Sequence, residues 1–163
     1  MLTTDKIEKK INSELTTKIK KSEILYGQIY LKIEAENLTN VLIFLKSDQD
    51  TKFKQLIDIT AVDYPENKDR FKMVYLLLSH ENNNRIILEY FINENEIVPS
   101  VTSIFPSANW MEREVFDMYG IKFKDHPDLR RILTDYEFEG YPLRKDFPIT
   151  GHKEVRYSQE KKK

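Results

Sequence analysis

Apolar residues recur every fourth position at the start of the chain and every second position through much of its middle. The four-residue spacing is carried by Ile7, Ile11, Leu15 and Ile19. On a lysine-rich background this spacing predicts an amphipathic helix, with Thr4 or Asp5 as its N-cap. Residues 26–35 then alternate between apolar and polar, which is typical of a half-buried strand.

A second helix is predicted after Asn37 or Thr39, either of which could serve as its N-cap. Its apolar positions are Val41, Leu42 and Leu45. Polar residues 46–54 follow as a loop. Residues 55–64 then form an apolar strand that ends at Pro65.

Two strongly apolar strands, residues 71–79 and 85–93, flank the turn sequence His-Glu-Asn-Asn-Asn and therefore predict an antiparallel hairpin. Residues 97–105 contain Pro99, which favours an edge strand or an extended crossover. A last helix is expected to begin with Ser107 or Asn109 as its cap and to end at Gly120. On it, Met111, Val115 and Met118 share one side, and Trp110, Glu114 and Asp117 share another.

The order α-β-α-β-β-β-α indicates a single α+β domain, with a mixed sheet around a central antiparallel hairpin and helices packed on a face. After it comes an irregular, proline-rich C-terminal segment. We divide the chain into an α+β domain over residues 1–121, an extended docking segment of the same domain over residues 122–157, and a charged tail over residues 158–163.

Composition narrows the function classes. The chain has 163 residues, a net charge of −1 and no cysteine. Near-neutrality argues against a nucleic-acid partner, and the lack of thiols excludes cysteine-ligated zinc or iron–sulfur sites and a thiolate nucleophile. No apolar run approaches the ~20 residues of a membrane-spanning helix, and the N-terminus has no apolar segment of the signal-peptide kind.

Glu112, Glu114 and Asp117, followed by His126, are the candidates for acid–base chemistry. Glu112 and Glu114 are two positions apart on a helix and point about 200° apart, so they cannot share a substrate proton. Structural ion pairing is the favoured interpretation. For His126 we expect donation to a backbone carbonyl, because no second histidine stands at a metal-ligand spacing.

Two basic pairs, Arg130-Arg131 and Arg144-Lys145, lie among acids and aromatics. Phosphate or nucleic-acid binding would need more positive charge, whereas arginine among Tyr and Trp is typical of protein interfaces. No glycine-rich nucleotide loop is present.

The same residues resemble the signature of the respiratory complex I 30 kDa family, the C-type subunit of NADH-quinone oxidoreductase. The core of the resemblance is Glu112-Arg113-Glu114, Asp117, His126, Arg130 and Ile132-Leu133. Three flanking stretches agree: DITAVDYP at 58–65, PSVTSIFP at 99–106 and GYPLRKDFP at 140–148. The resemblance is dense over residues 55–157. Family members are expected to continue past residue 157 with an extension that wraps a neighbour, whereas this sequence closes with SQEKKK.

The resemblance implies a non-catalytic structural subunit in the quinone module of the peripheral arm. It would bind no cofactor itself, while the complex uses FMN, iron–sulfur clusters and quinone. Its partners would be the larger, D-type subunit at the quinone site and neighbouring peripheral-arm subunits. It would lie on the matrix side of a mitochondrial inner membrane or the cytoplasmic side of a bacterial one.

We expect the contact with that partner to be made by the motif residues: Trp110, Glu112, Arg113, Glu114, Asp117, His126, Arg130, Arg131, Arg144, Lys145 and Asp146. Two alternatives stay open. One is the equivalent subunit of a ferredoxin-dependent NDH-type or hydrogenase complex. The other is a stand-alone acid–base enzyme that uses Glu114 and His126.

Overall fold

Buried and less buried side chains alternate along most of the middle strands, and the buried ones gather on one face of a sheet. The structure is a computed structural model that describes residues 2–135 and 137–151. The end of the segment over residues 122–157, and the charged tail over residues 158–163, lie outside the described residues.

Five strands form the main sheet in the order β1-β2-β5-β4-β3. They are β1 (Ile19–Leu25), β2 (Gln28–Ile33), β3 (Gln55–Asp63), β4 (Phe71–Ser79) and β5 (Asn84–Ile92). β2 and β5 pair in parallel, and every other pair in this sheet is antiparallel. The mixed sheet and its central β4–β5 hairpin are as the sequence predicts.

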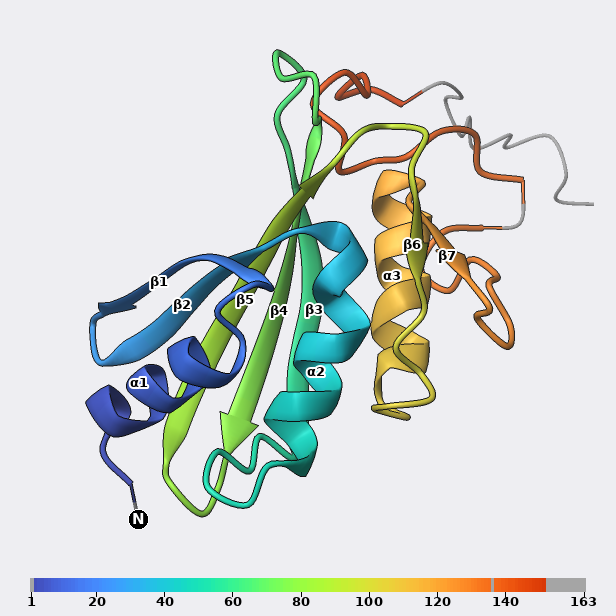
Figure 1. Ribbon diagram of the computed structural model, residues 1–163. Helices are drawn as coiled ribbons and strands as arrows, with labels where there is room; N and C mark the ends of the chain where they lie inside the picture. The colour runs from blue at the N-terminus through green and yellow to red at the C-terminus, as the bar shows by residue number, and fades with distance from the viewer. Residues whose placement is uncertain (1, 136, 152–163) are drawn as a thin grey trace, which may run out of the picture.

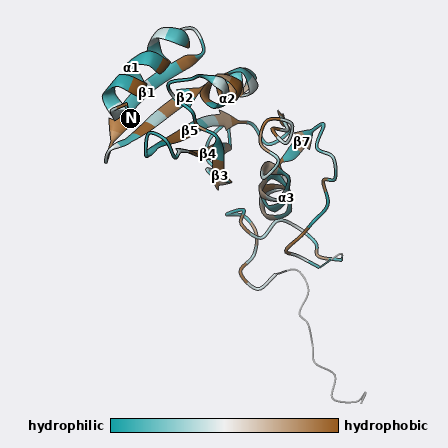
Figure 2. Ribbon diagram, turned by 90° about the horizontal axis from the view of Figure 1, so that it is seen from below, coloured by the Kyte–Doolittle hydropathy of each residue, from teal (hydrophilic) through white to brown (hydrophobic). Residues whose placement is uncertain are grey.

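Three helices lie on one face of this sheet (Figure 1). They are α1 (Thr4–Glu14), α2 (Leu38–Ser47), which follows the 3-10 turn η1 (Ala35–Asn37), and α3 (Ala108–Tyr119). Their apolar sides and the inward side chains of the strands form one continuous core. Figure 2 shows the sheet from its end, with α2 and α3 on the same side of β3 and β4.

Tyr75 of β4 and Tyr90 of β5 mark the centre of that core. Their rings are stacked with centroids 5.9 Å apart, and their hydroxyls are 3.2 Å apart. Both side chains are almost fully buried, and burial raises the pKa of each phenol above its ordinary value. The pair satisfies two buried polar groups with each other, as a dry core requires.

The first helix is shorter than predicted. It ends at Glu14, and Ile19 begins β1, a strand that the four-residue apolar spacing did not predict. β1 is stabilised by antiparallel pairing with β2, through a tight turn in which Tyr26 and Gly27 both adopt positive φ (52° and 75°). That conformation matches the twist of a two-residue hairpin, so the strand expected from residue 26 starts at Gln28 instead.

A second sheet of two short strands lies beside α3. β6 (Ile97–Pro99) pairs in parallel with β7 (Lys122–Lys124), and α3 is the crossover between them. The strand or crossover expected over residues 97–105 is therefore a strand only at its start. β7 is the first part of the segment predicted over residues 122–157, so this segment begins with a strand of the folded domain.

Candidate functional site

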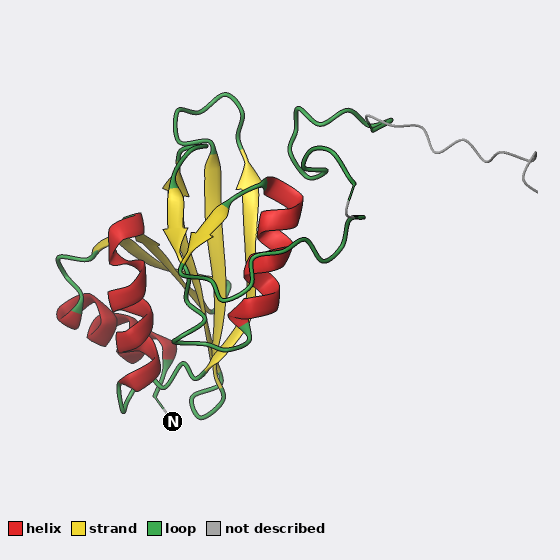
Figure 3. Cartoon of the chain, turned by 90° about the vertical axis from the view of Figure 1, so that its right-hand side faces the viewer, coloured by secondary structure: helices red, strands yellow, loops and turns green. Residues whose placement is uncertain are grey.

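The C-terminal segment folds back along α3 beside the end of the main sheet (Figure 3). Most of the motif charges make their contacts between these parts. Asp117 is the central group. Its side chain on α3 is fully buried, and its Oδ2 accepts the backbone N–H groups of Ile132, Leu133 and Thr134 at 3.0, 2.7 and 3.0 Å. Its Oδ1 accepts the Thr134 hydroxyl at 2.5 Å.

Burial by itself would raise the pKa of Asp117. The hydrogen bonds from the Thr134 hydroxyl and from the three backbone N–H groups outweigh burial and hold the pKa at about 2. Asp117 is therefore a charged brace for the turn over residues 132–134. Helical spacing puts Asp117 on the same side of α3 as Trp110 and Glu114, but unlike them it is buried, because the folded-back segment covers it.

Arg131 completes the environment of Asp117. Its Nη1 donates to Oδ1 of Asp117 at 2.9 Å, and its Nη2 donates to the carbonyl of Gly140 at 3.0 Å. The guanidinium also lies 5.2 Å from the ring centroid of Tyr141. One arginine thus ties α3 to two separate parts of the C-terminal segment.

Arg113 fixes the same segment one turn earlier. Its Nε donates to the carbonyl of Arg130 at 2.9 Å, and its Nη2 contacts the carbonyl of Arg131 at 3.4 Å. Its guanidinium lies 5.1 Å from the ring centroid of Trp110. Arg130 itself forms a two-bond ion pair with Asp128, at 2.6 and 2.7 Å.

His126 lies where the sequence predicts, at a structural turn. Its Nε2 is 3.1 Å from the carbonyl of Asn109, and its Nδ1 accepts the N–H of Asp128 at 3.0 Å. The neutral form with the proton on Nε2 satisfies both contacts. The imidazole therefore links the start of α3 to the turn after Pro127.

Glu112 faces the core, and Glu114 faces solvent, as their helical spacing predicts. The Oε1 of Glu112 accepts the N–H of Val101 at 2.7 Å, whereas its Oε2 has no hydrogen-bond partner and lies 3.9 Å from Nε2 of His126. Burial raises the pKa of Glu112 to about 7. Two carboxylates on opposite sides of one helix cannot act together on a substrate.

The second basic pair anchors the end of the described chain. Arg144 donates from Nε to the carbonyl of Tyr119 at 2.6 Å and from Nη1 to Glu94 at 2.5 Å. Its guanidinium lies 5.2 and 4.6 Å from the ring centroids of Phe71 and Tyr141. The arginine is thereby enclosed by the sheet, α3 and the C-terminal segment.

Lys145 and Asp146 meet Asp63 and Arg70, a pair that was not predicted as part of the site. The backbone N–H of Lys145 donates to Oδ2 of Asp63 at 2.7 Å, and Asp146 pairs with Arg70 at 2.9 Å. Arg70 in turn binds both oxygens of Asp63, at 2.7 and 2.9 Å. Its guanidinium lowers the pKa of Asp63 from the ordinary value. The DITAVDYP stretch was a signal for Asp63, but its partner could not be read from the sequence.

Seven of the predicted site residues make their principal side-chain contacts within the chain: Glu112, Arg113, Asp117, His126, Arg130, Arg131 and Arg144. Asp146 also pairs with Arg70, although it remains exposed. Trp110, Glu114 and Lys145 keep exposed side chains. Whether any of these residues also contacts another protein stays a prediction.

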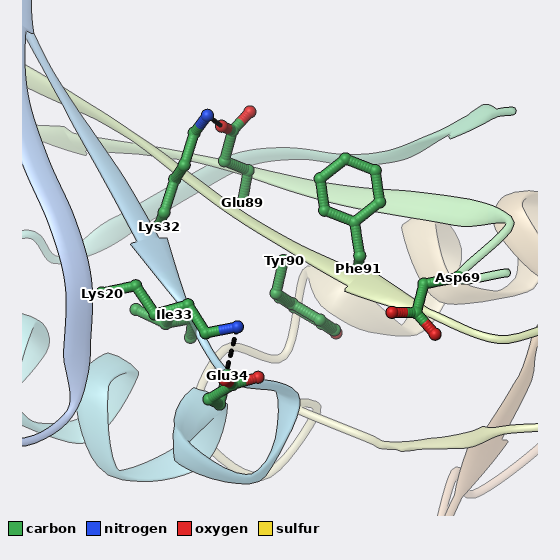
Figure 4. A pocket seen from close by; sticks show the side chains of 8 residues that line it. All are labelled: Lys20, Lys32, Ile33, Glu34, Asp69, Glu89, Tyr90 and Phe91. Atoms are coloured by element: carbon green, nitrogen blue, oxygen red, sulfur yellow. Dashed lines mark ion pairs between the residues drawn. The ribbon is translucent and has the colours of Figure 1, made fainter. Parts of the chain in front are cut away.

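A hollow of about 100 Å³ lies where β2 leaves the sheet beside β5 (Figure 4). Four of the five charged side chains that line it are paired with one another: Lys32 pairs with Glu89 at 3.1 Å, and Lys20 pairs with Glu34. Ligand pockets are usually about 300 Å³ or more. The hollow is therefore too small for a substrate, and most of its charged side chains are already paired with each other.

Neither a membrane span nor a metal cluster is found in the described ranges. No helix there is long and apolar enough to cross a bilayer. No group of three or more His, Asp or Glu side chains there could hold a metal ion.

The fold is similar to that of a chain in the membrane-bound sulfane sulfur reductase, an archaeal respiratory membrane complex. The TM-score is 0.77 at 25% identity, over 89% of this chain and 85% of that one. The fold and its braced C-terminal segment thus define a subunit of a membrane-associated respiratory complex. Residues 31–153 match the family described as respiratory-chain NADH dehydrogenase, 30 Kd subunit, and the chain belongs to this family.

Curated relatives agree over most of the chain. The C-type subunit of NADH-quinone oxidoreductase from Sinorhizobium medicae is 56% identical over 142 residues, which are 87% of this chain and 71% of that protein. The corresponding protein of Hyphomonas neptunium is 51% identical over 153 residues, covering 94% and 76% of the two chains. The family that the motifs resemble is confirmed.

Proposed function

We propose that this chain is a structural subunit in the quinone module of the peripheral arm of a proton-pumping NADH:quinone oxidoreductase. It braces the larger quinone-site subunit while electrons pass from NADH to quinone through other subunits. Relatives at 51–56% identity that are named as the C-type subunit of NADH-quinone oxidoreductase support this assignment.

One observation carries the structural role. The buried charges of the motif are used to fix the chain's own C-terminal segment against α3 and the sheet, with Asp117 as the clearest case. The oxygens of this carboxylate accept four hydrogen bonds from residues 132–134 and a fifth from Arg131, so no lone pair is left for a substrate. Both ring nitrogens of His126 are likewise used within the chain, and Glu114 is exposed on α3, which argues against an acid–base enzyme built on this pair.

The cofactors of such a complex are assigned to its other subunits. The sequence has no cysteine to ligate an iron–sulfur cluster and no glycine-rich loop to cradle the phosphate of FMN. We propose that this chain contributes contact surface and binds none of them.

The proposed location is peripheral, on the cytoplasmic side of a bacterial inner membrane or the matrix side of a mitochondrial one. Membership of a membrane-associated respiratory complex supports attachment at a membrane. The proposed direct partner is the larger, D-type subunit at the quinone site.

The structural similarity to the sulfane sulfur reductase chain favours one second candidate. In it, the same fold would serve a related complex that takes its electrons from ferredoxin or a hydrogenase centre. The subunits that co-purify with this chain separate the two: a flavin-containing NADH-oxidising module indicates the first, and a hydrogenase-like or ferredoxin-accepting module indicates the second.

Deletion of the gene tests the proposal. We expect the membranes to lose rotenone-type inhibitor-sensitive NADH:quinone reduction, while NADH oxidation by ferricyanide persists in the detached flavin module. Re-expression of the chain should restore both assembly and quinone reduction. A peripheral arm that assembles and reduces quinone at the normal rate without this chain would refute the structural role.

A further inference from the structure

The single tryptophan of the chain, Trp110, lies on the surface of α3 with 64% of its side chain exposed. We infer that Trp110 is a preformed anchor that inserts into an apolar, carboxylate-rimmed pocket on a neighbouring subunit of the respiratory complex. The inference rests on the proposed function, because it assumes that the chain is assembled with such a neighbour.

The first reason is the fixed platform beneath the indole. The guanidinium of Arg113 lies 5.1 Å from its centroid and is held by the carbonyls of Arg130 and Arg131. Arg113 is only 9% exposed, so the platform cannot move without breaking these bonds. Tryptophan and arginine held in this way are the side chains that dominate binding energy at protein interfaces.

The backbone beside the indole is fixed as well. The carbonyl of Asn109, the residue before Trp110, lies 3.1 Å from Nε2 of His126, and the other nitrogen of that ring accepts the N–H of Asp128. An anchor that is ordered before binding loses little conformational entropy when it docks. Arg113 and His126 therefore hold the tryptophan in place, although their own side chains are almost completely covered.

The charge around the indole defines the chemistry of the pocket. Arg130 is paired with Asp128, and the charge of Arg113 also helps to lower the pKa of that carboxyl. At hydrogen-bond distance, within the described residues, Arg113 has only neutral carbonyls as partners. Two guanidinium groups thus share one carboxylate, and the nearly buried Arg113 is only partly compensated for its loss of hydration. A carboxylate at the rim of the partner's pocket would supply the missing charge when the indole is inserted.

Tyr26 provides a matched comparison. It is 96% exposed, at the tip of the β1–β2 hairpin, and it makes no ring contact or side-chain hydrogen bond within the described part of the chain. Tyr26 is a large aromatic residue like Trp110, but no arginine in the described ranges packs against its ring as Arg113 does against the indole. If exposure alone made a docking residue, Tyr26 would serve at least as well as Trp110.

Hydroxyl-radical footprinting of the free chain and of the purified complex tests the burial of Trp110. We expect oxidation of Trp110 to fall at least about ten-fold on assembly, since interface anchors are fully desolvated. Absence of the chain from the complex would refute the proposed function. A chain that is present but keeps an equally accessible Trp110 would refute this inference alone.

Variants test the energetic role. Trp110→Ala should leave the folding midpoint of the free chain nearly unchanged but speed its dissociation from the complex at least about ten-fold. Trp110→Phe should restore part of the retention. A loss no greater than that caused by Tyr26→Ala would overturn the anchor.

Two further measurements test the nature of the partner. Dissociation of the wild-type chain should become faster between about 0.05 and 0.5 M NaCl, because salt screens the attraction between Arg113 and the carboxylate at the rim of the pocket. A dissociation rate that does not depend on salt would contradict a carboxylate at that rim. Sedimentation of the free chain with phosphatidylglycerol vesicles, abolished by Trp110→Ala, would overturn the protein pocket in favour of a lipid surface.

Discussion

The carboxylate of Asp117 binds Thr134 twice: Oδ1 accepts its hydroxyl at 2.5 Å, and Oδ2 accepts its backbone N–H at 3.0 Å. The two residues are 17 positions apart. One helical side chain thus fixes the path of the C-terminal segment at residues 132–134.

Asp117→Asn should strongly destabilise the free chain. The amide would place an N–H₂ group against donors from residues 132–134 and leave Arg131 without its carboxylate. We expect a loss of about 3–5 kcal/mol in the free energy of unfolding, measured by urea titration. Glu114→Gln, an exposed change on the same helix, is the control and should stay within about 0.5 kcal/mol. Equal effects of the two variants would contradict the brace.

Gly120→Ala should disturb the C-terminal segment. At φ 78° a side chain is strained, and a Cβ there would lie 2.6 Å from the ring of Tyr141 and 2.8 Å from Nη2 of Arg144. We expect a loss of about 2–4 kcal/mol, from backbone strain and overpacking together.

Gly27→Ala separates these two causes. Gly27 has a similar φ of 75°, but a Cβ added there would have nothing within 4 Å. Strain alone should cost about 1 kcal/mol. If thermal unfolding shows the same loss of stability for Gly120→Ala and Gly27→Ala, the close approach of Tyr141 and Arg144 to Gly120 does not contribute to the effect.

Glu112 should make the free chain less stable as the pH rises through the mildly acidic range. Its pKa is raised by burial to about 7, from an ordinary value of 4.5. The unfolded chain therefore releases this proton first, and stability falls between about pH 4.5 and 7 and then levels off. The total loss should be about 3 kcal/mol. The groups that face this carboxyl are His126, Tyr75 and Tyr90.

Glu112→Gln should flatten that part of the profile, because glutamine keeps an acceptor for the N–H of Val101 and does not ionise. Urea midpoints between pH 5 and 8 measure the slope. Asp117 loses its stabilising charge only below about pH 4, so its titration falls outside this window. An unchanged slope in the variant would show that another group is responsible.

Arg70→Lys should loosen the attachment of the C-terminal segment to the sheet. Lysine cannot reproduce the two parallel bonds to Asp63 or hold Asp146 at the same time. We expect a loss of about 1–3 kcal/mol and faster hydrogen exchange at the amide of Lys145, which donates to Asp63. Arg85→Lys, at an exposed position on β5, is the control. Unchanged protection of Lys145 would contradict the clamp.

The sequence by itself determined the elements whose apolar pattern and turn residues lie within one short stretch of chain. The strongly apolar residues 71–79 and 85–93, with an asparagine-rich turn between them, predict the central hairpin, which the structure has at 71–79 and 84–92. Gly120 likewise marks the end of α3. The opposite directions of Glu112 and Glu114 follow from helix geometry alone. The motif stretches likewise sufficed to identify the family.

Tertiary structure decided everything that depends on a distant partner. β1 and β7 carry weak signals of their own and exist because β2 and β6 pair with them. Asp63 meets Lys145 across 82 positions, and no local pattern encodes that contact. The same holds for the motif charges. The sequence shows which residues are charged or aromatic. Only the packing of the C-terminal segment against α3 determines that Asp117 is buried and hydrogen-bonded, whereas Trp110 on the same helix stays exposed.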